Sequence, residues 1–287
     1  MPLRLGARTF EDHELIVMAI VNRTPDSFFD KGATFGLDAA LDRVDQAIAE
    51  GADIIDIGGV KAGPGDDVDP AEELRRTADL VAAVRAAHPD VVISVDTWRA
   101  EVADVVCGLG CDLINDAWGG TEPAIFEVAA RHGVGIVCTH AGRLPPRTRP
   151  HRAAYDDVMR SVLEVTVGLA EQAVAAGVRA DGVLIDPGHD FGKNSRHSLE
   201  VTRRLPEMVA TGWPVLVSLS RKDFIGEVLD LPPGERLEGT LAATSISAWL
   251  GARVFRAHDV AATRRALDVV SAIRGNSDLR VGRRGLA

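Results

Sequence analysis

Eight short apolar runs alternate with helical patterns along this chain, and this alternation constrains the fold more than any other feature. The runs span residues 14–21, 52–58, 90–97, 112–117, 134–140, 182–188, 214–220 and 252–258. They are almost continuously apolar, as expected of strands that are covered on both faces of a sheet. The segments between them repeat apolar residues at helical spacing, among them one expected helix over residues 198–209, and several end in Gly, a common helix stop. This alternation predicts a parallel sheet, and eight such units predict a TIM (β/α)8 barrel. An open doubly wound sheet is the alternative.

The length of the chain fits one barrel, so we expect a single domain over residues 1–287. The barrel should extend from about residue 14 to about residue 274, and the polar residues 275–287 should form a flexible tail.

The formal net charge of −10 argues against nucleic acid as a partner. No segment resembles a membrane span or a signal peptide, and three Cys without a zinc or disulfide pattern fit a reducing compartment. We therefore expect a cytoplasmic protein without membrane association.

Polar side chains stand where the apolar runs end. They are Asn22, Asp96, Asn115, Asp186, Lys222, Arg256 and His258. Because the carboxyl ends of barrel strands share one face, we expect these side chains to gather at one mouth. Taken singly, Asp96 could cap a helix, Asp186 could belong to a turn, and Asn115 could mark a loop bend. Repetition at six strand ends favours a binding site.

The chemistry of one group suits a flat, nitrogen-rich ring. The carboxylates of Asp96 and Asp186 accept hydrogen bonds from ring N–H and amino groups, while the amide of Asn115 both donates and accepts. Lys222 adds a cation for a ring carbonyl, and Arg221 could stack on the ring or bind an anion.

A second group suits phosphate. Arg256 and His258 follow the eighth run, and barrels commonly bind phosphate near strands seven and eight. Asn22 and Asp26 could contact phosphate or a hydrated Mg²⁺. The loop over residues 141–152 is rich in Arg, and it either gathers near an anion or is simply a solvated basic loop.

Seven motifs in this chain resemble the ordered signature set of dihydropteroate synthases, from about Val17 to Ile273. They are NRTPDSF, DIGG, SVDT, LINDAWGG, DPGxxFGK, SRKDFIG and RAHDV. The resemblance implies a TIM barrel, usually a homodimer. Members condense a dihydropterin pyrophosphate with 4-aminobenzoate in folate synthesis, using Mg²⁺ and releasing pyrophosphate.

By resemblance, each candidate residue takes a family role. The pterin pocket falls on Asp96, Asn115, Asp186 and Lys222, and the pyrophosphate and metal site falls on Asn22, Arg256 and His258. The resemblance implies catalytic roles for Asp96, Lys222 and Arg256, and Asn22 as the metal residue.

The second loop departs from the family pattern. The family carries Glu-Ser-Thr-Arg-Pro-Gly after Gly59, whereas this chain has a VKAGPG run of equal length over residues 60–65. Ala62 stands at the Thr and Gly63 at the Arg, the pair that helps to order the reacting groups. Losing an Arg contact to a charged partner costs about 1.5–3 kcal/mol in binding, and more where charge develops in a transition state.

Other departures fall on the pocket walls. His189 and Asp190 replace an apolar residue and a Gly, Ser218 fills a Gly position, Ala117 replaces a larger aliphatic residue, and Arg23 replaces a Val. This many changes around one cavity suggest relaxed or redirected selection.

We therefore hypothesise an impaired or inactive dihydropteroate synthase-like protein that retains weak pterin, sulfonamide or sulfone binding. The alternative is an active synthase in which Lys61 or Arg23 supplies the missing charge, although Lys lacks the bidentate fork of Arg. A different pterin- or folate-binding barrel enzyme, or a non-catalytic partner with a dimer face over residues 235–274, also stays open.

Overall fold

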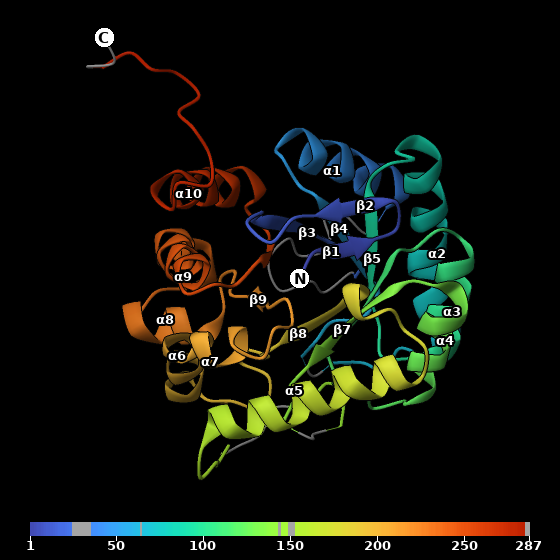
Figure 1. Cartoon of the computed structure of the whole chain (residues 1–287). Helices are drawn as coiled ribbons and strands as arrows, with labels where there is room; N and C mark the ends of the chain where they lie inside the picture. The colour runs from blue at the N-terminus through green and yellow to red at the C-terminus, as the bar shows by residue number, and fades with distance from the viewer. Residues whose placement is uncertain (25–35, 64, 143–144, 149–152, 285–287) are drawn as a thin grey trace.

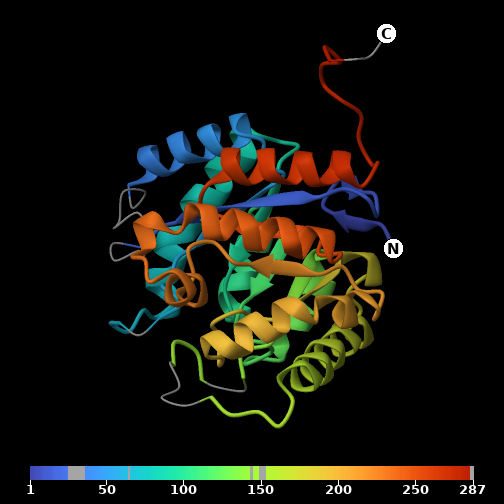
Figure 2. The same ribbon diagram turned by 90° about the vertical axis from the view of Figure 1, so that its left-hand side faces the viewer.

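Eight parallel strands curve into a barrel that is surrounded by helices (Figure 1, Figure 2). The computed structural model describes residues 1–24, 36–63, 65–142, 145–148 and 153–284. The strand order is β8-β7-β6-β5-β4-β3-β10-β9. One isolated parallel bridge, between Ile185 and Val215, brings the two ends of the sheet together. The predicted barrel is confirmed, and the open doubly wound sheet is wrong.

Each barrel strand falls on one of the eight apolar runs. The strands are β3 (Ile16–Asn22), β4 (Ile54–Gly58), β5 (Val92–Asp96), β6 (Leu113–Asp116), β7 (Gly135–Thr139), β8 (Val183–Asp186), β9 (Leu216–Ser218) and β10 (Val254–Ala257). Only β3 reaches beyond its predicted run, by one residue to Asn22.

The helices lie outside the barrel. They are α1 (Leu37–Ala49), α2 (Pro70–Ala87), α3 (Ala100–Gly108), α4 (Ala124–His132), α5 (Val158–Ala175), α6 (Ser195–Arg203), α7 (Leu205–Val209), α8 (Asp223–Leu229), α9 (Leu237–Trp249) and α10 (Val260–Ile273), with 3-10 turns η1 (Ala180–Gly182) and η2 (Pro233–Glu235). No helix within the described ranges is both long and apolar enough to cross a membrane.

The sequence pattern was wrong for two helical segments. It predicts one helix over residues 198–209, but the helix breaks at Arg204 because Pro206, in the first turn of α7, has no N–H to continue the hydrogen-bond ladder. The pattern also misses α8, whose seven residues are too few to show helical periodicity.

An N-terminal hairpin precedes the barrel and was not predicted. Strands β1 (Leu3–Leu5) and β2 (Arg8–Phe10) pair antiparallel. The side chains of Leu3, Leu5 and Phe10 are almost completely buried, and they pack with the inward-facing residues at the amino-terminal ends of the barrel strands. The hairpin therefore closes that end of the barrel.

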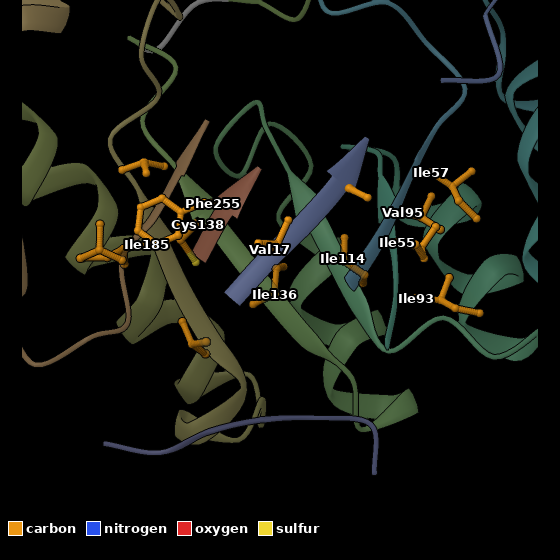
Figure 3. Packing of buried hydrophobic residues seen from close by; sticks show 14 of the residues in the cluster. Val17, Ile55, Ile57, Ile93, Val95, Ile114, Ile136, Cys138, Ile185 and Phe255 are labelled. Atoms are coloured by element: carbon orange, nitrogen blue, oxygen red, sulfur yellow. The ribbon is translucent and has the colours of Figure 1, made fainter. Parts of the chain in front are cut away.

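The two faces of each strand explain why the site lies at the opposite end. Outward residues such as Val17, Ile55 and Val95 pack in the large cluster with the helices (Figure 3). Inward residues are apolar in the deeper layer, for example Ile54 and Val254. Since side chains alternate, the residue two positions further along faces inward again. Those positions hold Asp56, Ser94, Asn115, Asp186, Ser218 and Arg256.

Candidate functional site

A cavity of about 200 Å³ opens at the carboxyl ends of the strands. Of the predicted site residues, Asn22, Asp96, Lys222, Arg256 and His258 line it together. Asn115 and Asp186 do not line it. Asn115 is 3% exposed and Asp186 is 5% exposed. Both are buried next to residues that line the cavity.

The floor of the cavity is organised by Arg256. Its Nε donates to Asp56 Oδ2 at 2.6 Å and its Nη2 donates to Asp96 Oδ2 at 3.0 Å. Asp56 is fully buried and also accepts from Ser94 Oγ at 2.6 Å and from Asn115 Nδ2 at 3.3 Å. Sequence reasoning missed Asp56, although it lies in the DIGG motif. The sequence feature that could have identified Asp56 is its inward-facing position, two residues after Ile54.

Asp96 is poised between its charged and neutral forms. Burial raises its pKa to about 7; the nearby Arg256 opposes the shift, and the carboxylate of Asp56 adds to it. A ligand that brings N–H donors to this carboxylate would stabilise the ionised form. The residue therefore suits the amino and N–H edge of a heterocycle.

Lys222 also lines the cavity. Its Nζ donates to the carbonyl of His189 at 2.6 Å and lies 4.9 Å from the centre of the Phe191 ring. Burial lowers the pKa of Lys222, while Asp190 and Asp186 favour its charged form. Asp186 Oδ1 accepts the N–H of Gly188 at 2.7 Å, so the carboxylate also holds the turn that the sequence suggested.

A second buried lysine ties two loops together. Lys193 Nζ lies 2.6 Å from His140 Nδ1 and donates to the carbonyls of His140, Gly188 and Phe191. Burial lowers its pKa to about 7. Sequence reasoning gave Lys193 no role, although it closes the DPGxxFGK motif.

Asp190 occupies a backbone conformation that favours Gly. Its φ is +64°, and it stands where the family motif has Gly. Its carboxylate accepts the N–H of Asp223 at 2.7 Å, and its Oδ1 accepts from Ser198 Oγ at 3.1 Å. These bonds hold Asp190 in place, so a carboxylate lines the cavity at this position.

Arg221 does not take the role that the sequence suggested. Its guanidinium makes two bonds of 2.8 Å to the carboxylate of Asp259 and donates to the carbonyls of Pro233 and Gly234. It is absent from the cavity wall. The expectation that it stacks on a ring or binds an anion is wrong, because these contacts tie together the loops around β9 and β10.

The side chain of His258 lies at the cavity, whereas that of Arg23 points away from it. His258 lines the cavity, with Nδ1 2.9 Å from Ser220 Oγ. Arg23 is 6% exposed and its Nη1 lies 3.5 Å from the carboxylate of Asp79 on α2. Arg23 therefore does not supply the cation missing from the second loop, whereas Lys61 does line the cavity.

The second loop forms one wall of the cavity through residues 60–63. Val60 is buried against Trp98, Trp118 and Ala141. Arginines hold the loop carbonyls. Arg76 donates to Gly59, Arg147 to Gly63 and Asp66, and Arg99 to Val68. Of the basic loop, Arg147 therefore binds main-chain carbonyls; Arg143, Arg149 and Arg152, like Asp26, lie outside the described residues.

The fit to a metal ion rests on Asn22. Among the described residues, no three His, Cys, Asp or Glu side chains are grouped to hold a metal. Beside Asn22, the missing side chain of Gly58 leaves room, since a Cβ there would lie 3.2 Å from Asn22 Oδ1. Mg²⁺ keeps several waters and often takes few protein oxygens when it also binds phosphate. The amide fits such an ion as a single protein ligand.

Comparison with known proteins agrees with this geometry. The model of the pterin binding enzyme family matches residues 18–258. Inactive dihydropteroate synthase 2 of Mycobacterium leprae is 55% identical over 286 residues, covering 98% of each chain. Dihydropteroate synthase of Haemophilus influenzae is 39% identical and covers 88% of this chain and 92% of its own. The structure of Yersinia pestis dihydropteroate synthase with a sulfonamide drug matches with a TM-score of 0.90 and 37% identity, over 96% of this chain and 100% of that one. The chain therefore belongs to the pterin-binding enzyme family of dihydropteroate synthases and their relatives.

Proposed function

We propose that this chain is a dihydropteroate synthase-like protein that binds a pterin-like ring but does not carry out the condensation with 4-aminobenzoate. The observation that carries the proposal is the wall of the cavity at Ala62 and Gly63, which presents a methyl group and a bare backbone where the family has Thr and Arg. The Mycobacterium leprae relative carries the name inactive dihydropteroate synthase 2, which supports the proposal. The direction of Arg23 toward Asp79 disfavours the active alternative.

The proposed ring site uses residues that the geometry brings together. Asp96 accepts ring N–H groups and Lys222 meets a ring carbonyl, while Asp186 and Asn115, buried beside the cavity, support its floor. Asp96, Lys222 and Arg256 are the residues that would act on the substrate if chemistry occurred. Weak sulfonamide or sulfone binding is part of the proposal, because the Yersinia pestis relative is seen with a sulfonamide drug.

Anion binding would use three polar residues that line the same cavity. They are Asn22, Arg256 and His258, and Arg256 already shares its charge between Asp56 and Asp96. Mg²⁺ bound at Asn22 would offset the charge of a diphosphate. We propose that the metal enters only together with such a ligand.

The proposal also covers assembly and location. Ile246, Trp249, Val269 and Ile273 are each more than half exposed, and they lie on α9 and α10, which run side by side (Figure 1, Figure 2). Such an apolar patch suits a two-fold contact with a second copy of the chain. We expect a homodimer by light scattering and a monomer for Trp249→Glu. Three free, buried cysteines fit the cytoplasm.

The experiment measures product and binding on the same sample. Purified protein with Mg²⁺, dihydropterin pyrophosphate and 4-aminobenzoate should form no dihydropteroate above background, while calorimetry should detect 6-methylpterin binding that Asp96→Asn weakens. The Haemophilus influenzae enzyme is the positive control. Turnover on the order of 1 s⁻¹, at the low end of ordinary enzymes, would refute the proposal. The double change Ala62→Thr and Gly63→Arg tests whether the loop alone is responsible.

A further inference from the structure

We propose that the outer part of this cavity selects a pterin-like ligand that carries an uncharged aryl group and rejects the same ligand with a carboxylate on that group. The inference rests on the proposed pterin site and names the ligand class that it accepts. It follows from the residues that a substituent meets as it leaves the strand ends.

Part of the wall of the outer cavity is aromatic and apolar. Val60, Trp118 and Phe191 all line it. The rings of Trp118 and Phe191 are 5.0 Å apart at 68°, and Trp98 lies behind Trp118 at 6.5 Å and 80°. Edge-to-face packing of this kind offers a ring face and edges to another aromatic group. The wall therefore suits a flat apolar substituent.

The outer cavity is also lined by two acidic residues. Asp190 and Asp223 both line it, near the start of α8. The side chain of Asp223 is 48% exposed, and its Oδ1 lies 3.1 Å from Arg236 Nη1. The carboxylate of Asp190 accepts the N–H of Asp223 and lies close to it. A ligand carboxylate would enter beside two carboxylates, and like charges at this separation disfavour binding.

The cations of the same cavity already face carboxylates. Arg256 contacts Asp56 and Asp96. The charge of Lys222 is favoured by Asp190 and Asp186. Lys61 also lines the cavity, on the second loop. Because it is a cation of the cavity wall, the experiment tests it directly.

The apolar wall is formed before any ligand arrives. Val60 is 9% exposed and buried in the aromatic cluster, and Arg76, Arg147 and Arg99 hold the carbonyls around it. An aryl group would pack on this wall without having to order Val60, which makes binding less costly. Because the contacts of the arginines go to backbone carbonyls, they do not depend on the side chains that the loop has lost.

Calorimetry with three probes tests the inference on the full chain. The probes are 6-methylpterin, pteroate, and 6-(anilinomethyl)pterin, which is pteroate without its carboxylate. We expect the anilino compound to bind about tenfold more tightly than pteroate, from the repulsion of like charges. If 6-methylpterin and both aryl compounds fail to bind, the proposed pterin site itself is wrong. If 6-methylpterin binds but pteroate equals or exceeds the anilino compound, only the present inference is overturned.

Variants separate the two causes of the preference. Asp223→Asn should strengthen pteroate binding several-fold, toward the affinity of the anilino compound, because it removes a negative charge that repels the carboxylate of pteroate. The affinity of the anilino compound, which carries no carboxylate, should not change. Val60→Ala should weaken the anilino compound and leave 6-methylpterin unchanged. Lys61→Ala should weaken pteroate binding by less than Asp223→Asn strengthens it, and should leave the anilino compound unchanged. A loss of pteroate affinity in Lys61→Ala, with no gain in Asp223→Asn, would show that the mouth binds carboxylates and would overturn the inference. Circular dichroism of each variant establishes that it is folded.

Discussion

Replacing Asp56 with Ala should destabilise the protein more than any single change on the surface. Asp56 is fully buried and accepts from Arg256 Nε and Ser94 Oγ, each at 2.6 Å, and from Asn115 Nδ2 at 3.3 Å. Breaking a buried pair leaves an uncompensated charge, which costs about 3–5 kcal/mol. Arg256 retains Asp96 at 3.0 Å, so we expect a loss at the lower end of that range, about 3 kcal/mol.

The assay is equilibrium urea unfolding followed by circular dichroism. Asp104→Ala is the matched control, since Asp104 also pairs with an arginine, Arg131, at 2.7 Å but is 48% exposed. Exposed pairs contribute about 0–1 kcal/mol, so the control should lose less than about 1 kcal/mol.

A double variant tests whether the cost comes from the unpaired charge. Asp56→Ala combined with Arg256→Met should lose less stability than the sum of the two single variants, because neither Asp56 nor Arg256 is then left as a buried charge without the other. The loss of the Arg256–Asp96 contact is common to Arg256→Met and the double variant, so it cancels in this comparison. A loss below about 1 kcal/mol for Asp56→Ala, or a double variant additive within about 0.5 kcal/mol, would refute the reasoning.

Two further predictions concern the cavity and its wall. The affinity for 6-methylpterin should rise as pH increases through about 7 and level off roughly one pH unit above it, because burial raises the pKa of Asp96 to about 7 and ring N–H donors bind the carboxylate form. Calorimetry should show this rise in the wild type and a flat profile in Asp96→Asn; a flat wild-type profile would contradict the assignment. Arg147→Met should speed hydrogen exchange over residues 60–68, because it removes the bonds to the carbonyls of Gly63 and Asp66. Unchanged exchange in that segment would mean that Val60, Arg76 and Arg99 hold the loop without Arg147.

Much of the fold was predictable because its signals are local. Each barrel strand lies on an apolar run, and helix starts carry their own cap, as Asp69 does by accepting the N–H of Glu72 before α2. The errors also have local causes. Pro206 breaks a helix that periodicity alone continues, and α8 is too short to have a period. The N-terminal hairpin was missed because its two strands have only three residues each.

The candidate site was predictable in its members but not in its connections. The sequence alone determined that polar residues end the strands of a parallel barrel, and therefore that Asn22, Asp96, Lys222, Arg256 and His258 share a mouth. Only the tertiary structure decided which of these charges meet. Arg256 reaches Asp56, 200 residues away in the chain, because barrel closure places β10 next to β3 and brings both side chains into one inward layer. Contacts of that kind depend on barrel closure and stagger, which no short stretch of sequence encodes.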